Sequence, residues 1–243
     1  MTLAPTLDRS SLTDRIAGCD WPALEPALDA EGYATLPPLL TPAECAELIA
    51  RYDEADRFRS RIDMARHRFG VGEYKYFANP LPPLVQELRS QIYPRLVPTA
   101  NRWQERLGVE QRYPVELVAF LDRCHDAGQS KPTPLQLRYE AGGYNCLHQD
   151  IYGAVAFPLQ VVFMLTQREN YRGGEFLLVE QRPRAQSRGQ VIALEQGEGL
   201  IFTTRERPLV GSRGYYRANV RHGVSRIAEG VRVTLGIIFH DAA

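Results

Sequence analysis

The C-terminal half of the sequence consists of short apolar or alternating segments separated by glycine-rich or polar turns. In the run Leu135-Gln136-Leu137-Arg138-Tyr139 every second residue is apolar, and 161–165 is apolar throughout. Alternation with a period of two places one set of side chains on one face of a strand. Such segments occur at 135–139, 159–166, 175–179, 191–194, 200–204, 215–222 and 232–239. Seven or eight short strands at this spacing predict a β-sandwich or barrel.

The N-terminal half carries helical patterns instead. Thr41 can cap a helix that has Pro42 in its first turn and Glu44 placed to close a capping box. We therefore expect a helix over about 42–57, preceded by a short strand at 32–37. A second helix is expected over about 83–107, where Pro94 and Pro98 must kink or split it, and a third over about 115–126.

Length and composition fit a single α+β domain in which N-terminal helices pack on one sheet of a β-core. We expect an N-terminal extension at 1–30 and one domain at 31–243, with a helical front at 31–130 and the β-core at 131–243. No signal peptide and no apolar run of membrane-spanning length is present. We therefore expect a cytoplasmic protein, and nothing in the sequence implies a membrane or an obligate protein partner.

The charges balance overall but not locally. The chain has 29 basic and 29 acidic residues, which argues against a partner that is coated with negative charge. Residues 180–232, however, contain ten arginines and five glutamates, with no Asp or Lys. This segment is either a basic face for an anionic substrate such as nucleic acid or the result of a general bias toward arginine, and we favour the bias. The cysteines lie far apart without a C-x-x-C pair, so neither a zinc knuckle nor a dithiol site is predicted.

His148-Gln149-Asp150 is the most specific local feature. On a strand or at its end, residues i and i+2 project to the same face, so His148 and Asp150 can point at one spot. His222 ends a predicted strand and is the best third ligand, which would complete the two-histidine, one-carboxylate pattern of non-haem Fe(II) oxygenases. Arg232 follows on the next strand, where a buried guanidinium needs an anion. Taken singly, His222 also suits a core histidine and Arg232 an exposed strand arginine.

The stretch from Arg138 to Asp150 resembles the R-Y-x-x-G-x-x-x-x-L-H-Q-D segment of AlkB-type alkylation-repair dioxygenases. Gly173-Gly174-Glu175-Phe176, His222-Gly223-Val224 and Arg232-Val233-Thr234-Leu235 are similar to further strands of the same superfamily, the Fe(II)/2-oxoglutarate-dependent oxygenases. The resemblance covers roughly 134–240. It implies a double-stranded β-helix, or jelly-roll, core.

Over its whole length the chain looks closest to a bacterial family described as oxygenases acting on damaged DNA. The residues that carry this likeness are Gly72-Glu73-Tyr74-Lys75-Tyr76-Phe77, Ala127-Gly128-Gln129, Leu147-His148-Gln149-Asp150, Glu180-Gln181-Arg182-Pro183-Arg184 and Ile238-Phe239-His240-Asp241.

Carried over position by position, the resemblance implies that His148, Asp150 and His222 bind Fe(II). Arg232 would pair with the distal carboxylate of 2-oxoglutarate, and Tyr139 would donate a hydrogen bond to it. The protein would be a dioxygenase that consumes O2 and 2-oxoglutarate, hydroxylates a C–H bond and releases succinate and CO2.

The sequence departs from the AlkB pattern at two positions. Leu137 replaces an Asn two residues before the tyrosine, and Ile238 replaces a second arginine, while the spacing from His222 to Arg232 is that of prolyl hydroxylases. The substrate therefore stays open between alkylated nucleic acid, which would be oxidatively demethylated, a protein side chain of the prolyl type, and a small molecule. Two other classes of function remain: a non-catalytic metal-binding jelly-roll module, and a cupin-like zinc or manganese enzyme.

Two further features have alternative interpretations. Cys146, His148 and Asp150 are spaced two residues apart, so on one strand their side chains point to the same face. Cys146 then either faces the iron or is a small buried apolar residue. Tyr74, Tyr76 and Phe77 around Lys75, with the basic run 57–68, form either a stacking and phosphate-binding surface or core packing between helices and β-core. We favour core packing.

Overall fold

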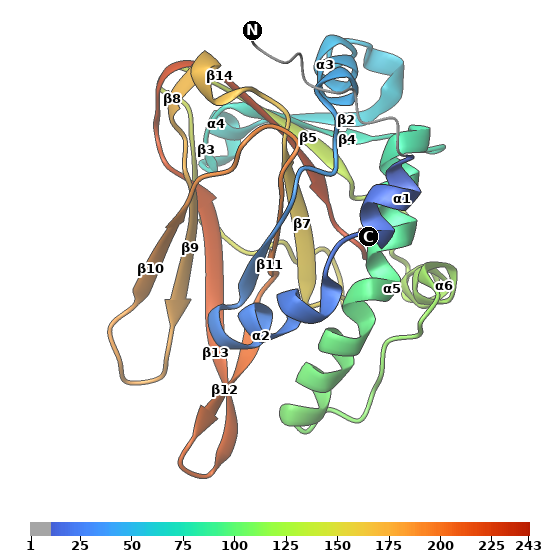
Figure 1. The fold of residues 1–243 in the computed structure, drawn as a ribbon, viewed down its shortest axis with the longest axis vertical. Helices are drawn as coiled ribbons and strands as arrows, with labels where there is room; N and C mark the ends of the chain where they lie inside the picture. Colours follow the sequence, from blue (N-terminus) through green and yellow to red (C-terminus); the bar gives the residue numbers. More distant parts are fainter. Residues whose placement is uncertain (1–10) are drawn as a thin grey trace, which may run out of the picture.

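The computed structural model describes residues 11–243, which fold as two antiparallel β-sheets with helices packed against one of them (Figure 1). The architecture is the jelly roll that the resemblance implies, with the helices on the outer face of the larger sheet. The helices are α1 (Leu12–Ala17), α2 (Trp21–Glu31), α3 (Pro42–Ala50), α4 (Met64–His67), α5 (Pro83–Arg106) and α6 (Leu117–Asp126), with short 3-10 turns at Ala55–Arg57 and Arg168–Asn170.

The larger sheet has the strand order β1-β11-β7-β14-β5-β4-β2, with β8 paired to one end of β14. Its strands are β1 (Tyr33–Leu36), β2 (Phe58–Asp63), β4 (Glu73–Phe77), β5 (Leu135–Glu140), β7 (Leu159–Met164), β8 (Tyr171–Gly173), β11 (Gly199–Thr203) and β14 (Ile227–Ile237). The smaller sheet has the order β10-β9-β13-β6-β3, with β12 paired to β13. Its strands are β3 (Gly70–Val71), β6 (Tyr144–His148), β9 (Phe176–Gln181), β10 (Arg188–Ile192), β12 (Glu206–Gly211) and β13 (Gly214–Val224).

Strand β7 shows why part of the sequence is apolar without alternation. Val161 and Phe163 join the core cluster that the larger sheet forms with α5, whereas Val162 and Met164 join the cluster between the two sheets. A strand that is buried on both faces has no polar side. The smaller sheet leaves its outer face open, and Val191 on β10 is 69% exposed. The interior between the sheets is therefore the space in which a site can be enclosed.

The expected helices are present, with two differences. The capping box of Thr41 and Glu44 forms at the start of α3. This helix was expected to reach residue 57 but ends at Ala50, because the chain turns directly after Ala50 and buries Tyr52. Helix α5 continues through Pro94 and Pro98 without being split. Each proline removes one backbone hydrogen bond. The α5 face that packs on the larger sheet, including Leu88, Ile92 and Leu96, holds the helix together because it is fully buried.

Several elements have no counterpart in the sequence-based expectation. Residues 12–31 form α1 and α2, whose Leu12, Ile16 and Leu28 lie in the main core cluster. Of the extension expected over 1–30, residues 1–10 lie outside the described part of the chain. Strand β1 is the one expected at 32–37, whereas β2, β3 and β4 also lie within 31–130 and were not expected, so both sheets receive strands from that segment.

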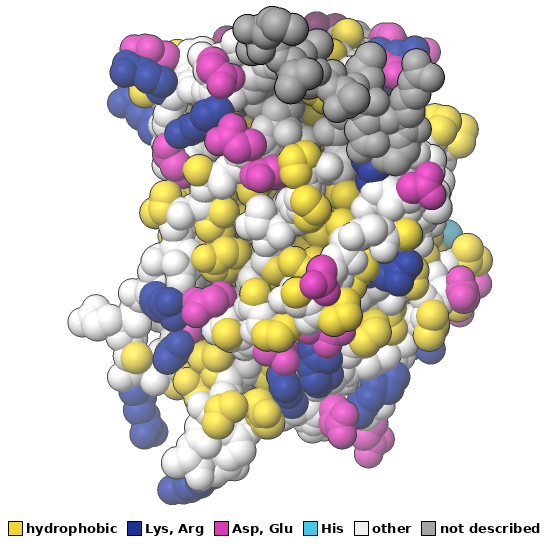
Figure 2. Space-filling model, in the orientation of Figure 1, with side chains coloured by type: hydrophobic (Ala, Val, Ile, Leu, Met, Phe, Trp, Pro, Cys, Tyr) yellow, Lys and Arg dark blue, Asp and Glu magenta, His cyan; other side chains and the backbone are white. Residues whose placement is uncertain are grey.

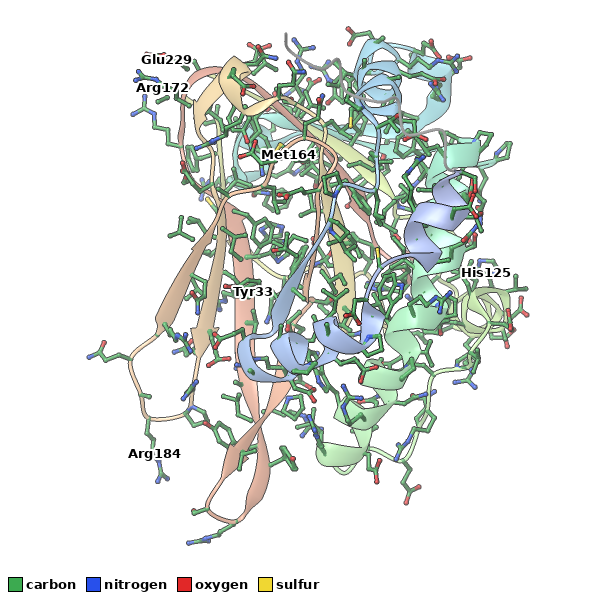
Figure 3. All side chains as sticks on the ribbon, in the orientation of Figure 1. Tyr33, His125, Met164, Arg172, Arg184 and Glu229 are labelled. Atoms are coloured by element: carbon green, nitrogen blue, oxygen red, sulfur yellow. The ribbon has the colours of Figure 1, made fainter. Side chains whose placement is uncertain are left out.

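The arginine-rich segment is partly neutralised by glutamates. Ion pairs join Arg182 and Arg207 to Glu180, and Arg217 to Glu206. Arg184 lies at the tip of the β9–β10 hairpin (Figure 3). On the face shown in Figure 2, cationic and anionic side chains are interspersed. This distribution agrees with a general arginine bias.

Candidate active site

Three side chains with metal-ligating atoms meet between the two sheets. His148 ends β6, Asp150 follows two residues later, and His222 lies on β13 directly opposite His148 in the strand register. Nε2 of His222 is 3.1 Å from one carboxylate oxygen of Asp150, and Nε2 of His148 is 3.5 Å from the other. The ligand atoms all lie within 4.8 Å of one another. Two imidazoles and one carboxylate in this arrangement offer the donor set of a facial metal triad, and we call these three residues the triad.

The imidazoles are held in orientations that suit metal binding. Nδ1 of His148 donates a hydrogen bond to the carbonyl oxygen of Cys146 at 2.8 Å, which leaves Nε2 as the free ligand atom. The ring of His222 is stacked on Phe176 with centroids 5.7 Å apart and packs edge-on against Phe202 at 4.8 Å. Two aromatic contacts and a strand on each side fix this ring in place.

The pKa shifts in the triad favour the ionised carboxylate of Asp150 and the neutral imidazole of His222. Burial raises the pKa of Asp150, but attraction to His222 and the hydrogen bonds with both histidines outweigh it and hold that pKa well below its usual value. Burial, together with the nearby His148, lowers the pKa of His222. Burial opposes the charge on His148 as well, but its hydrogen bond to Asp150 raises its pKa overall. Neutral imidazole and ionised carboxylate are the forms that bind metals.

A chain of hydroxyl groups supports Asp150 from behind. Tyr152 donates a hydrogen bond to Oδ1 of Asp150 at 2.7 Å, and Tyr76 donates to the hydroxyl of Tyr152 at 3.0 Å. Sequence reasoning did not single out Tyr152, and it placed Tyr76 in the core without this role. Residues 76 and 152 are far apart in the chain, so no local pattern signals the contact. Hydrogen bonds of this kind orient a ligating carboxylate.

Arg232 on β14 is almost completely buried, interacts with the hydroxyl of Tyr171, and makes no ion pair with any residue from 11 to 243. It is 1% exposed, and its Nε and Nη2 atoms have no hydrogen-bond partner among the described residues. Burial lowers its pKa, yet a guanidinium remains protonated at neutral pH because its usual pKa is so high. Gly174 adjoins this side chain at φ +69°, and a Cβ there would lie 2.8 Å from Cδ of Arg232. An unpaired buried cation calls for an anion.

Tyr139 lies beside Arg232. It is fully buried on β5, directly opposite Arg232 in the register, and Nδ2 of Asn145 donates a hydrogen bond to its hydroxyl at 3.2 Å. Burial raises the pKa of Tyr139, so its hydroxyl stays protonated and able to donate. The two residues therefore offer a cation and a neutral donor at one end of the interior.

All five residues singled out from the sequence border one cavity of about 340 Å³. Its wall is formed by both sheets and by the segment after β6, with Arg68, Phe69, Tyr74, Tyr76, Leu135, Leu137, Tyr139, Asn145, Cys146, Leu147, His148, Gln149, Asp150, Tyr152, Gln160, Val161, Val162, Phe176, Phe202, His222, Val224, Arg232, Thr234 and Gly236. Asp150 is the one acidic residue in this lining, and it belongs to the triad. The residues fit a divalent metal with a dicarboxylic acid that reaches from it toward Arg232.

The two open interpretations are settled by burial. Cys146 is exposed and lines the cavity, so the alternative of a buried apolar residue is wrong. Lys75 is buried and donates to the backbone carbonyl of Tyr52 at 2.8 Å, and Tyr76 and Phe77 are buried as well. Core packing is thus confirmed for these three residues. Ile238, where AlkB-type enzymes carry a second arginine, packs in an apolar cluster with Tyr76 and Leu135.

Comparison with known proteins identifies the family. A family model named Oxygenase-NA, described as an oxygenase catalysing oxidative methylation of damaged DNA, matches residues 72–242. The chain belongs to this family. Two uncharacterized proteins of Mycobacterium tuberculosis, from strains CDC 1551 / Oshkosh and ATCC 25618 / H37Rv, are each 51% identical to it over 168 residues, which is 69% of this chain and 72% of the relative.

Solved structures with a similar fold include prolyl hydroxylases. A Pseudomonas putida prolyl-4-hydroxylase matches with a TM-score of 0.53 at 14% identity over 92% of this chain and 100% of the other. A Trichoplax adhaerens prolyl hydroxylase in complex with a hypoxia inducible factor peptide matches with a TM-score of 0.53 at 13% identity over 95% of this chain and 92% of the other. These likenesses concern the fold.

Membership of Oxygenase-NA, the jelly roll and the His-Asp-His group together make the protein an Fe(II)- and 2-oxoglutarate-dependent dioxygenase that uses O2. An enzyme of this kind is favoured over the non-catalytic module and the cupin-like alternative that the sequence left open. Between residues 11 and 243, no helix is both long and apolar enough to cross a membrane.

Proposed function

We propose that this oxygenase removes a methyl group from a nitrogen atom of a damaged nucleobase. Hydroxylation of an N-methyl carbon consumes one O2 and one 2-oxoglutarate and gives an N-hydroxymethyl group, succinate and CO2. The N-hydroxymethyl group then breaks its C–N bond, leaving N–H on the base and releasing formaldehyde. The observation that carries the proposal is the buried guanidinium of Arg232, whose Nε and Nη2 have no partner among the described residues, in the same cavity as the triad and in a family described as acting on damaged DNA.

In this proposal His148, Asp150 and His222 would hold the metal, each with one ligand atom. Bound iron with 2-oxoglutarate supplies the oxidation of a C–H bond. Asp150 is kept ionised by the two imidazoles and kept in orientation by Tyr152. The aromatic neighbours of His222 hold its imidazole in one orientation, so this side chain would offer its ligand atom without rearrangement.

Arg232 and Tyr139 bind the distal carboxylate of 2-oxoglutarate in this proposal. The planar guanidinium fork suits a carboxylate, and the protonated Tyr139 hydroxyl adds a second donor. Apolar residues such as Leu137 and Val162 line the wall between the two ends and exclude water from the reacting centre. This chain thereby orients the co-substrate and keeps the site dry, while the oxidation belongs to the cofactor.

The test is turnover with defined substrates under iron, ascorbate and 2-oxoglutarate. Single-stranded DNA oligonucleotides that carry one N1-methyladenine or N3-methylcytosine are the substrates, and unmethylated oligonucleotides are the controls. We expect succinate and formaldehyde to form in equal amounts and the oligonucleotide to lose 14 Da, a mass difference that follows from replacing a methyl group by hydrogen. Succinate formation that methylated oligonucleotides fail to stimulate would refute the proposal.

A prolyl-type protein hydroxylase is the second candidate function. Two observations favour it: the likeness of the fold to prolyl hydroxylases and the ten-residue step from His222 to Arg232. Proline-rich peptides assayed beside the oligonucleotides test it directly. A peptide that gains 16 Da and stimulates succinate release, with the oligonucleotides inert, would establish this function instead.

A further inference from the structure

An exposed apolar patch lies at the mouth of the cavity. Phe69, Val71, Tyr144 and Leu147 are each between 39% and 47% exposed, and we call these four residues the rim patch. Val71 on β3 is paired with Tyr144 on β6, and the backbone N–H of Cys146 donates to the carbonyl oxygen of Phe69 at 2.8 Å, so the segments 69–71 and 144–147 lie side by side. Phe69 and Leu147 also line the cavity. Clustered apolar exposure beside an active-site opening marks a binding surface.

Phe69 of the rim patch forms an aromatic platform with the neighbouring His67. The rings of His67 and Phe69 are stacked, with centroids 5.3 Å apart and an angle of 22° between the planes. The turn after α4 holds them, because the backbone N–H of Phe69 donates to the carbonyl oxygen of Met64 at 3.0 Å. Both side chains are exposed to solvent. A planar surface of this kind can stack on any of the nucleobases, so it binds a strand regardless of the strand's sequence.

Positive charge borders the rim patch. Arg68 lies between the two rings in sequence, lines the cavity, and makes no ion pair with any residue from 11 to 243. The backbone carbonyl oxygen of Arg205, which makes no ion pair with residues 11–243, accepts a hydrogen bond from Nε2 of Gln149 in the cavity wall at 2.9 Å, so the backbone of a second exposed arginine adjoins this wall. Asp150 is the acidic residue of the cavity lining and is committed to the triad. The mouth therefore attracts anions such as phosphate.

Inside the cavity, the side-chain amide of Gln160 has a nitrogen without a hydrogen-bond partner among the described residues. Gln160 on β7 is 2% exposed, and its Nε2 has no hydrogen-bond partner among the described residues. It is paired with Phe202 in the register, and the Phe202 ring packs against His222. Gln160 therefore lies on the metal side of the cavity. A carboxamide carries a donor and an acceptor side by side and can pair with the edge of a nucleobase, whereas a proline ring offers neither group.

We propose that the rim patch, His67 and Arg68 hold a single nucleic-acid strand, and that the target base turns into the cavity, where Gln160 pairs with its edge. This inference rests on the proposed function and assigns its substrate-binding residues. When the target base leaves its stack, a neighbouring base stacks on Phe69 and so recovers part of the lost stacking energy. Arg68 contacts the adjoining phosphate. Gln160 makes the cavity selective among bases of similar size.

Binding to the rim is tested with a fluorescein-labelled single-stranded oligonucleotide that carries one N1-methyladenine, added to the full chain with Mn²⁺ and N-oxalylglycine. We expect Phe69→Ala to weaken binding about 5- to 100-fold, as loss of one stacking contact does. Arg68→Gln is expected to weaken binding and to reduce the slope of log K against log salt by about 0.7. Arg184→Gln is the matched control, because Arg184 is an unpaired arginine at the distant β9–β10 tip (Figure 3), and it should bind like the wild type.

The role of Gln160 is tested by base preference. The ratio of kcat/KM for N1-methyladenine to that for N3-methylcytosine is measured in the wild type, in Gln160→Glu and in Gln160→Met. Glutamate keeps the shape but replaces the donor by an acceptor, and methionine removes both. We expect the ratio to change at least about 10-fold in both variants, the discrimination that one base-edge pair provides. A ratio that stays constant in both variants would refute base reading by Gln160.

The outcomes separate this inference from the proposed function. A wild-type protein that neither binds nor demethylates any methylated oligonucleotide overturns both. A wild-type protein that demethylates oligonucleotides while Phe69→Ala and Arg68→Gln bind as tightly as it does overturns the rim assignment alone. Hydroxylation of a peptide, weakened by the same two variants, would show that the rim holds a protein and would overturn the nucleic-acid class. Thermal unfolding of each variant verifies that it is folded.

Discussion

The guanidinium carbon of Arg232 lies 5.8 Å from the centre of the Tyr139 ring, and the two residues face each other across the β14–β5 pair. Tyr139 thus contributes an aromatic ring toward the cation and a protonated hydroxyl, which Asn145 positions. A cation and a neutral donor on adjacent strands make a rigid end wall for a carboxylate. The relationship also explains how a charge can be buried here without a protein counter-ion, because the ring face attracts it.

The first prediction compares two buried arginines. Arg207 and Arg232 are each 1% exposed, but Arg207 donates to Glu180 at 2.7 Å and to the backbone carbonyl oxygens of Asp29 and Ala30. Arg207→Met should lower the free energy of unfolding by about 3 to 5 kcal/mol, since it leaves Glu180 buried without its main partner. Arg232→Met should leave the free energy of unfolding unchanged or higher, because it removes an unpaired charge. Chemical denaturation measures both.

The same pair separates stability from co-substrate binding. Arg232→Met should raise the KM for 2-oxoglutarate about 10- to 100-fold, the cost of losing a charge-assisted carboxylate contact. In the wild type with Mn²⁺, 2-oxoglutarate should raise the melting temperature, and in Arg232→Met it should not. A variant that binds 2-oxoglutarate as well as the wild type would show that Arg232 is not the carboxylate partner.

The second prediction concerns Tyr152. Tyr152→Phe removes the hydrogen bond to Oδ1 of Asp150 and keeps the ring. We expect the affinity for Co²⁺ to fall about 10- to 100-fold, as is usual when an outer partner of a ligating carboxylate is lost, and the visible spectrum of bound Co²⁺ to change. Tyr113→Phe is the matched control, because the Tyr113 hydroxyl donates to the carbonyl oxygen of Ala156 rather than to a triad residue. Equal Co²⁺ affinity in all three proteins would contradict a positioning role.

The third prediction tests the triad. Asp150→Asn keeps the shape of the side chain but removes the charge, so Mn²⁺ affinity measured by calorimetry should fall by at least about 100-fold, the upper end of the loss expected for an outer partner. Metal-dependent thermal stabilisation should disappear with it. His125→Ala, in helix α6 (Figure 3), removes an imidazole that contacts Asp241 instead and should bind Mn²⁺ normally. Retained Mn²⁺ affinity in Asp150→Asn would place the metal elsewhere.

The fourth prediction is a pH dependence of stability that arises from His240. Burial lowers the pKa of His240 to about 4, and its Nδ1 accepts a hydrogen bond from the backbone N–H of Phe157. The unfolded chain has a histidine pKa near 6.5 and takes up the proton first, so the stabilising contribution is complete above pH 6.5 and is lost as the pH falls toward 4. The loss amounts to about 3 kcal/mol at pH 4.

His240→Gln cannot titrate and should lack this component. Between pH 7 and pH 4 the wild type should therefore lose about 3 kcal/mol more unfolding free energy than His240→Gln. The triad titrates in both proteins and cancels in the difference. Parallel curves for the wild type and His240→Gln would refute the assignment.

The sequence predicts the parts of the site that lie on strands in a regular register. His148 and Asp150 are two residues apart, and His222 and Arg232 lie on successive strands. The two-residue period of a strand and the order of the strands along the chain are therefore enough to predict that these side chains lie close together. The strands at 135–139, 159–166 and 200–204 were predictable for the same reason, because alternation or a continuous apolar run reflects which faces are buried.

The remaining parts depend on contacts that leave no local pattern. The hydrogen bond from Tyr76 to Tyr152 spans 76 residues, and the unpartnered state of Gln160 becomes evident only once its neighbours are in place. Helix α5 is another case. Its two prolines predict a split helix from propensity alone, but burial of the face that packs on the larger sheet stabilises one continuous helix. Propensity is a local quantity, whereas these features are decided by packing between distant segments.

The direct pairing of His222 with His148 links chemistry to correct folding. Side chains alternate between the faces of a strand, so pairing β13 one residue out of register would turn His222 away and present Arg221 or Gly223 to the interior. In the proposed metal site such a chain would lack one of its three ligands, so metal uptake during refolding would report native strand alignment.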